Sequence, residues 1–275
     1  MQDNLKKRIT TALIIYAIVA SIILYSNDLF VRIFLNIIVF LSAFEISKMC
    51  FNNNNSEQNN KKHYMFIAFV FLSIFLSNIL IKNNIWHYFI IASCILWLLI
   101  SIYIINLRSI VIVERFNYTY MLIFIFLLGS FYCSLYTLYK LSPKTLLFLV
   151  SFVALSDISA YFLGKLFGKS PFFNIISPSK TREGFIGSII VCSILVLLYC
   201  IVREYEFYFI IKLLFISMLV VSISAIGDLS VSLIKRNSRC KDSGNILPGH
   251  GGILDRIDSL LSSAPVFLLV IFYLL

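Results

Sequence analysis

Nine long apolar runs limit the fold of this chain more than any other feature. The runs lie near residues 9–26, 29–48, 64–81, 86–106, 118–139, 145–164, 185–202, 207–230 and 259–275. Each has roughly the 17 to 25 residues that an α-helix needs to cross the hydrocarbon core of a bilayer. Because that core offers the backbone no water, a crossing segment has to satisfy its own hydrogen bonds, as a helix does. The sequence therefore predicts an all-α, polytopic integral membrane protein with about nine transmembrane helices.

Composition supports the same prediction. Of the 275 residues, 60% are hydrophobic and 13% are charged, whereas soluble domains carry roughly 25% charged residues. The first run follows a basic segment, as in a signal peptide, but it is long and no small-residue cleavage site comes after it. We therefore expect the first run to be retained as a helix.

The basic residues indicate how the helices are oriented. If the helices alternate in direction, 17 of the 23 basic residues fall on the side of the N-terminus. The other six are Arg32, Lys82, Lys140, Lys144, Arg203 and Lys212. The positive-inside rule then places the N-terminus and the late charged loops on the cytoplasmic face of the inner (plasma) membrane. The net charge of +10 follows from this bias and from contact with anionic headgroups, so no nucleic-acid partner is predicted.

The carboxylates are unevenly distributed along the chain. Five of the 13 lie in the first 144 residues and eight in the last 131. We therefore expect residues 1–145 to form a transmembrane scaffold and residues 146–275 to form the catalytic region, with its active-site loops in the cytoplasm. Nothing in the sequence explains Glu45, which interrupts the second run. A partner on another helix and a surface position beside Lys48 both remain open.

A first polar cluster lies inside the sixth run. Asp157, Tyr161, Gly164 and Lys165 follow the spacing of one helical face. A carboxylate inside a membrane span is costly, which favours a partner or a water-filled cavity. We expect Asp157 and Tyr161 to bind substrate, the alternative being a structural Asp157 that pairs with a neighbouring helix.

A second cluster, from Ser177 to Gly184, precedes the seventh run. Pro178 ends any helix before it, and Ser179 or Thr181 can cap the helix that follows. Lys180 and Arg182 would then lie near a helix N-terminus, which itself attracts anions. This arrangement predicts phosphate binding, although ordinary flanking charge at a membrane surface is the alternative.

A third cluster begins in the eighth run. Ser224, Asp228, Ser232 and Lys235 form a polar stripe along one side of an apolar helix, so the stripe has to face the protein interior or a cavity. Turn-forming residues follow, up to the pair Gly251 and Gly252.

The acidic residues of the third cluster suggest a cation site. Asp255 and Asp258 lie one turn apart at the start of the last run, and Asp228 comes from another helix. Such a trio suits a hard cation such as Mg²⁺, held together with phosphate oxygens and waters. The alternative for the pair is compensation of the helix dipole, which accounts neither for Asp228 nor for the glycines. One ion or two are equally compatible with these residues.

At this point the residues resemble a known family. The segment from Ser232 to Asp258 reads S-L-I-K-R-x4-K-D-S-G-x3-P-G-H-G-G-x2-D-R-x-D. It resembles the signature of the phosphatidate cytidylyltransferases, also called CDP-diacylglycerol synthases. Shorter segments at Asp157 to Gly168, at Ser177 to Gly184 and at Gly227 to Leu229 agree in the same order. The resemblance covers roughly residues 150–262.

The resemblance implies transfer of a cytidylyl group from CTP to phosphatidate, with CDP-diacylglycerol and pyrophosphate as products. Phosphatidate brings its own nucleophile, because its phosphate has a second pKa of about 6. The enzyme then has to align two polyanions and neutralise the charge of the leaving pyrophosphate. The implied partners are CTP, phosphatidate and membrane lipid, and a homodimer is compatible with the sequence.

On this hypothesis the charged residues take three roles. The predicted divalent-cation ligands are Asp228, Asp255 and Asp258, which with Lys241 form the predicted catalytic set. The predicted substrate-binding residues are Asp157, Tyr161, Lys180, Arg182, Lys235, Arg236, His250, Gly251, Gly252 and Arg256. Among these, Arg182 stands where the family commonly has an aromatic residue, and a hydrogen-bonded structural role is the alternative for His250.

Other classes of protein fit the sequence less well. A transporter or channel would use Asp157 and Asp228 as ion-coupling sites, but the charges gather in one layer and not across the membrane. A lipid kinase that uses CTP, such as a polyprenol kinase, differs in which phosphate is attacked. A purely structural role would leave the clustered carboxylates and glycines without explanation.

Overall fold

The fold was analysed in a computed structural model, which describes residues 2–51, 57–107, 118–244, 246 and 251–274. Within these residues the chain forms nine α-helices and one β-hairpin. The helices are α1 (Gln2–Tyr25), α2 (Asp28–Phe51), α3 (Glu57–Lys82), α4 (Trp86–Ile105), α5 (Tyr118–Leu141), α6 (Pro143–Phe167), α7 (Arg182–Val202), α8 (Phe207–Asn237) and α9 (Leu254–Leu274). The hairpin pairs β1 (Pro171–Phe173) with β2 (Ser177–Thr181).

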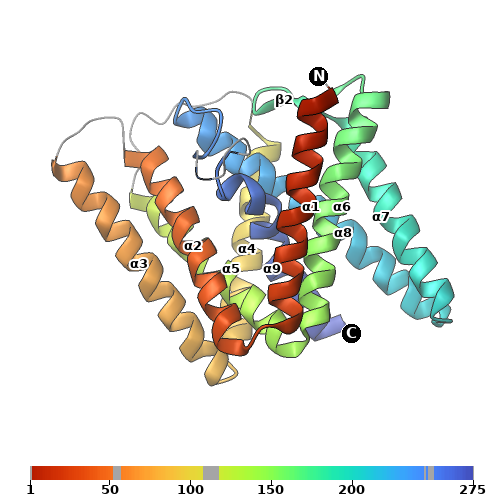
Figure 1. The fold of residues 1–275 in the computed structure, drawn as a ribbon, viewed down its shortest axis with the longest axis horizontal. Coiled ribbons are helices and arrows are strands. Elements are labelled where there is room, and N and C mark those ends of the chain that lie inside the picture. The colour runs from red at the N-terminus through yellow and green to blue at the C-terminus, as the bar shows by residue number, and fades with distance from the viewer. Residues whose placement is uncertain (1, 52–56, 108–117, 245, 247–250, 275) are drawn as a thin grey trace.

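The helices run back and forth between two ends of the molecule. The N-terminus, the hairpin and the connection from α8 to α9 lie at one end, and the C-terminus lies at the other (Figure 1). Eight helices are long and apolar enough to span a membrane, and α1 adds the apolar stretch Leu13–Tyr25. The predicted all-α, polytopic membrane fold is confirmed.

The helix α8 is longer than the predicted run near 207–230. It has 31 residues, which at 1.5 Å per residue gives a length of about 46 Å. The hydrocarbon core of a bilayer is only about 30 Å thick. The last turns of α8, which carry Lys235 and Arg236, lie at the end of the molecule where the hairpin lies.

The packing separates central helices from peripheral ones. In α5, Leu127, Leu128 and Phe131 are buried, and α5 packs against α3 and α9. In α7, by contrast, Ile190 and Ile194 are exposed. Exposed apolar side chains are stable there because lipid tails, not water, surround the outer helices.

The β-hairpin was not predicted from the sequence. Its two strands are antiparallel, with Pro171 opposite Thr181. The ring of Phe172 stacks on that of Phe185 in α7, with 4.7 Å between ring centroids. The Thr181 side chain accepts a hydrogen bond from the Gly184 backbone N–H at 3.1 Å, which confirms the prediction that Ser179 or Thr181 caps the helix. The hairpin is thereby fixed over the ends of α6 and α7.

Candidate active site

A cavity of about 490 Å³ opens between α6, the hairpin, α7 and α8. The four polar-face residues predicted on α6, Asp157, Tyr161, Gly164 and Lys165, all line it. Asp157 is exposed to this cavity, although it lies about 15 Å before the end of α6. The prediction that these residues share one face, turned toward a cavity, is confirmed.

The opposite wall of the cavity carries an ion pair. Lys180 from β2 donates to Asp228 from α8, and both residues line the cavity together with Ser224. The Ser232 hydroxyl, one turn further along α8, donates to Asp228 Oδ1 at 3.3 Å. The predicted polar stripe on α8 therefore does face an interior space, and its carboxylate meets the first predicted phosphate-binding lysine there.

Two further carboxylates gather beside Asp228. The Ser259 hydroxyl donates to Asp157 at 3.2 Å, and the Ser259 backbone N–H donates to Asp258 at 2.8 Å. Asp157, Asp228 and Asp258 are close enough to repel one another electrostatically. Asp157 and Asp228 line the cavity, and Asp258 lies beside them; we call these three residues the cavity carboxylates.

A close approach of α8 and α9 brings two of the cavity carboxylates together. A Cβ atom placed on Gly227 would overlap the Ser262 hydroxyl and the Asp258 carbonyl oxygen, both in α9. Because glycine has no side chain, the two helix backbones come into contact at this point. Asp228, the next residue in α8, is thereby held beside the first turns of α9.

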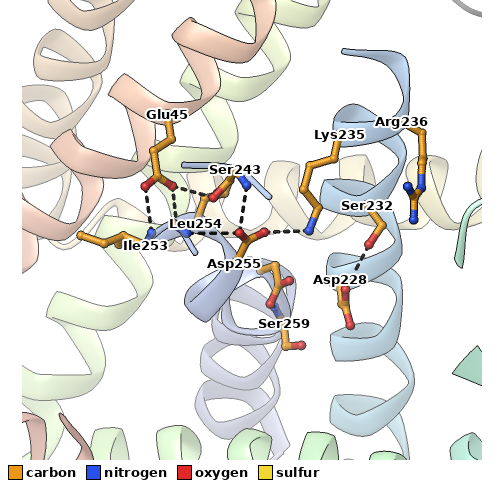
Figure 2. Close-up of polar contacts among 12 residues, drawn as sticks. Glu45, Asp228, Ser232, Lys235, Arg236, Ser243, Ile253, Leu254, Asp255 and Ser259 are labelled. Carbon is orange, nitrogen blue, oxygen red and sulfur yellow. Dashed lines mark hydrogen bonds and ion pairs between the residues drawn. The ribbon is translucent and has the colours of Figure 1, made fainter. Parts of the chain in front are cut away.

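Asp255 lies in a different polar cluster (Figure 2). One carboxylate oxygen forms an ion pair with Lys235 Nζ at 2.7 Å. The other accepts hydrogen bonds from the backbone N–H groups of Ser243 at 2.9 Å and of Gly252 at 3.3 Å. Both oxygens of Asp255 are therefore engaged by protein donors.

Glu45, whose role the sequence left open, also belongs to this region, and its burial rules out the surface position beside Lys48. It lies in α2, is only 2% exposed, and points at the connection between α8 and α9 (Figure 2). Its carboxylate accepts from the Ser243 hydroxyl at 2.7 Å and from the backbone N–H groups of Ile253 and Leu254, both at 2.9 Å. The signal was present in the sequence, because a carboxylate inside an apolar run requires a partner, but the partner lies about 200 residues away.

The remaining predicted residues lie around these two clusters. The Arg236 side chain donates to the Ile176 carbonyl oxygen in the hairpin at 3.3 Å, and Arg182, Lys241 and Arg256 are exposed. Gly251 has a positive φ of 79°, a conformation that glycine adopts without strain. The prediction for His250 lies outside the described residues.

The predicted cation trio is divided between the two clusters. Asp228 and Asp258 belong to the cavity carboxylates, whereas Asp255 pairs with Lys235. In the described part of the chain, no three His, Cys, Asp or Glu side chains converge as a complete metal site. The trio as a set of ligands stays a prediction.

Known proteins of similar sequence belong to the family that the sequence motifs resemble. The chain is 45% identical over 119 residues to the phosphatidate cytidylyltransferase of Bacillus subtilis (strain 168), which covers 42% of this chain and 44% of that protein. It is 37% identical over 145 residues to the phosphatidate cytidylyltransferase of Aquifex aeolicus (strain VF5), covering 51% and 54% of the two chains. The chain thus spans about half the length of the curated relatives it matches.

A family model extends the similarity beyond these aligned segments. The model described as the Cytidylyltransferase family matches residues 6–274. This range takes in the hairpin, both polar clusters and the nine described helices except the first four residues of α1. The chain therefore belongs to the cytidylyltransferase family.

Proposed function

We propose that this protein is a phosphatidate cytidylyltransferase, which transfers a cytidylyl group from CTP to phosphatidate. One observation carries the proposal: two carboxylates, Asp157 and Asp228, and Lys180 meet at a cavity that also has apolar walls, formed by residues such as Phe172, Phe185 and Val221. Such a cavity suits a substrate with a phosphate headgroup and acyl chains. The names of the relatives support the same substrates.

The reaction needs no nucleophile from the protein. A phosphate oxygen of phosphatidate forms a bond to the α-phosphorus of CTP, and the bond from that phosphorus to the bridging oxygen of the β-phosphate breaks. Pyrophosphate leaves with the electron pair, and CDP-diacylglycerol remains. The chain contributes by holding both phosphates in line and by balancing their charge.

The cavity carboxylates fit a divalent cation. Their oxygens are hard ligands of the type that Mg²⁺ prefers, and Lys180 is the one salt-bridge partner that the described residues give to these three acidic groups. A bound cation would neutralise charge on the substrate phosphates. We propose that Asp228 and Asp258 hold the cation, with Asp157 beside them, and that Asp255 joins only if its bonds to the loop change.

The basic residues at the end of α8 would bind the triphosphate. Lys235 and Arg236 lie on the last turns of α8, and Lys241 is exposed on the connection that follows. Gly251 and Gly252 let backbone N–H groups approach phosphate oxygens. Lys180 lines the cavity, so we propose that it contacts the lipid phosphate.

The proposed orientation places this end of the molecule in the cytoplasm. The N-terminus, the hairpin and the connection from α8 to α9 lie at the same end, which is the end with most of the basic residues. CTP is made in the cytoplasm, so the proposed site is open to it. The division at residue 145, a homodimer and the lack of a nucleic-acid partner stay predictions.

The test follows label from CTP into lipid. Purified protein in detergent micelles is mixed with phosphatidate, Mg²⁺ and CTP labelled at the α-phosphate, and label in the organic phase is measured with pyrophosphate release. The proposal expects labelled lipid that disappears when the cation is chelated. A parallel assay uses CTP labelled at the γ-phosphate. Lipid label from this nucleotide alone would instead identify a kinase, and no lipid label from either nucleotide would overturn the proposal.

A further inference from the structure

The structure points to Glu45 as a positioning residue for the nucleotide site, an inference that rests on the proposed function. Glu45 comes from α2, in the region expected to be scaffold, and its carboxylate is buried. A buried carboxylate is costly unless donors surround it. Among the described residues Glu45 has three such donors: Ser243 and Ile253 in the connection between α8 and α9, and Leu254 at the start of α9.

The three donors come from two separate parts of the chain. Ser243 is in the first half of the connection, and Ile253 and Leu254 are where α9 begins. Because one carboxylate binds all three, it ties the first half of the connection to the start of α9. Glu45 also accepts from the first backbone N–H group of α9, so it fixes where that helix starts.

Ser243 links Glu45 to Asp255, because it donates a hydrogen bond to each carboxylate. Its hydroxyl donates to Glu45 at 2.7 Å while its backbone N–H donates to Asp255 at 2.9 Å. Asp255 in turn holds Lys235 at 2.7 Å. A continuous series of short contacts therefore runs from α2 to the lysine that we propose binds the triphosphate (Figure 2).

The backbone of the connection is fitted closely around the carboxylate. A Cβ atom on Gly252 would overlap both Glu45 oxygens and the Ser243 hydroxyl, and one on Gly244 would lie 2.7 Å from Glu45 Oε1. Any larger residue at either position would push the loop away from Glu45. The two glycines and the carboxylate thus form one packed unit.

The test uses Glu45→Gln in the full chain. A glutamine presents one oxygen and one NH₂ group. Because the two backbone N–H groups donate to different oxygens of Glu45, the NH₂ group would face one of these donors and could not accept from it. Loss of a hydrogen bond to a charged group corresponds to about a tenfold change. We expect the KM for CTP to rise about tenfold, the KM for phosphatidate to stay unchanged, and hydrogen exchange at Ile253 and Leu254 to accelerate.

Ser47→Ala is the matched control. Ser47 is buried in the same helix, but its hydroxyl donates to the Phe44 carbonyl oxygen of α2 itself. We expect this variant to keep both KM values and the exchange rates of the connection. An equal rise in the KM for CTP in Ser47→Ala would assign the effect to α2 in general and overturn the inference.

The outcomes separate this inference from the proposed function. If the wild-type protein transfers no cytidylyl group, the proposed function fails and this inference fails with it. If the wild type is active and folded Glu45→Gln keeps its KM for CTP, a merely structural role is shown and this inference alone is overturned. Should Glu45→Gln not fold, Ser243→Ala removes the same link from the other side, and an unchanged KM for CTP there would also overturn it.

Discussion

The two clusters at the ends of α8 and α9 use carboxylates in opposite ways. Glu45 and Asp255 are matched by donors: three for Glu45, and an ammonium and two backbone N–H groups for Asp255. Among the described contacts of the cavity carboxylates, by contrast, one salt bridge serves three acidic groups. Matched carboxylates hold the chain in place, whereas a group of carboxylates with a single cationic partner can take up a further cation.

This comparison separates two effects of a substitution. Neutralising a matched carboxylate leaves donors without an acceptor and lowers stability. Neutralising a member of a repelling group relieves repulsion, so stability does not fall. Activity falls all the same, because a proposed ligand of the cation is lost. The following substitutions test that separation.

The largest effect is expected for Asp258→Asn. Removal of one cavity carboxylate weakens cation binding, and we expect kcat to fall by about a thousandfold in the α-labelled CTP assay. The melting temperature in detergent should not decrease, because repulsion from Asp157 and Asp228 is relieved. A clear loss of stability with activity retained would place Asp258 among the structural carboxylates, and the two clusters would then not differ in role.

Lys180→Met is expected to act on both properties. Without its ammonium group the cavity carboxylates lose their salt bridge, and a substrate phosphate loses a cation. We expect kcat/KM for phosphatidate to fall by about a hundredfold and the melting temperature to drop. Lys180→Arg keeps the charge and should recover part of both; a Met variant with normal kinetics would remove Lys180 from the site.

Gly227→Ala tests whether the contact between α8 and α9 positions the cavity carboxylates. The new methyl group meets the Asp258 carbonyl oxygen and Ser262, and overpacking of this type costs about 1–3 kcal/mol. We expect activity to fall by about tenfold. Gly187→Ala is the control, because its methyl group would meet the side chain of Leu163, which can move; equal losses in both variants would argue against a special role for Gly227.

Glu45→Gln should destabilise the protein where Asp258→Asn does not. The buried carboxylate loses at least one accepted hydrogen bond, which corresponds to about 2 kcal/mol. Thermal unfolding in detergent, followed by intrinsic fluorescence or light scattering, measures the difference between the two variants. Equal melting temperatures for Glu45→Gln and the wild type would mean that the hydrogen bonds to Glu45 do not stabilise the fold.

The smallest effect is expected for Asp28→Asn, at the opposite end of the molecule. Asp28 pairs with Arg32 at 3.1 Å and with Lys140 at 2.8 Å, but these side chains are 39–49% exposed. Exposed ion pairs contribute less than about 1 kcal/mol, so we expect little change in stability and none in transfer activity. A large loss of activity would show that the two ends of the molecule are coupled.

The sequence alone was sufficient to predict the membrane fold and the helical faces that carry Asp157 and Asp228. Apolar length predicts a spanning helix because the bilayer has a fixed thickness, and all nine predicted runs correspond to helices. Helical spacing likewise predicted the faces of Asp157 and Asp228, because residues one turn apart point the same way whatever surrounds them. The hairpin was not predictable in the same way, because its short strands have no apolar alternation and depend on Phe172 packing against α7.

Only the tertiary structure decided which carboxylates lie together. Spacing placed Asp255 with Asp258, one turn apart, but the loop donors and Lys235 bind Asp255 whereas α6 and α8 surround Asp258. It also decided the partner of Glu45, which no local pattern contains, since the donors are brought to α2 by the packing of the whole bundle. Local sequence determines what a segment can form and which face is polar, but which polar faces meet depends on how distant helices pack.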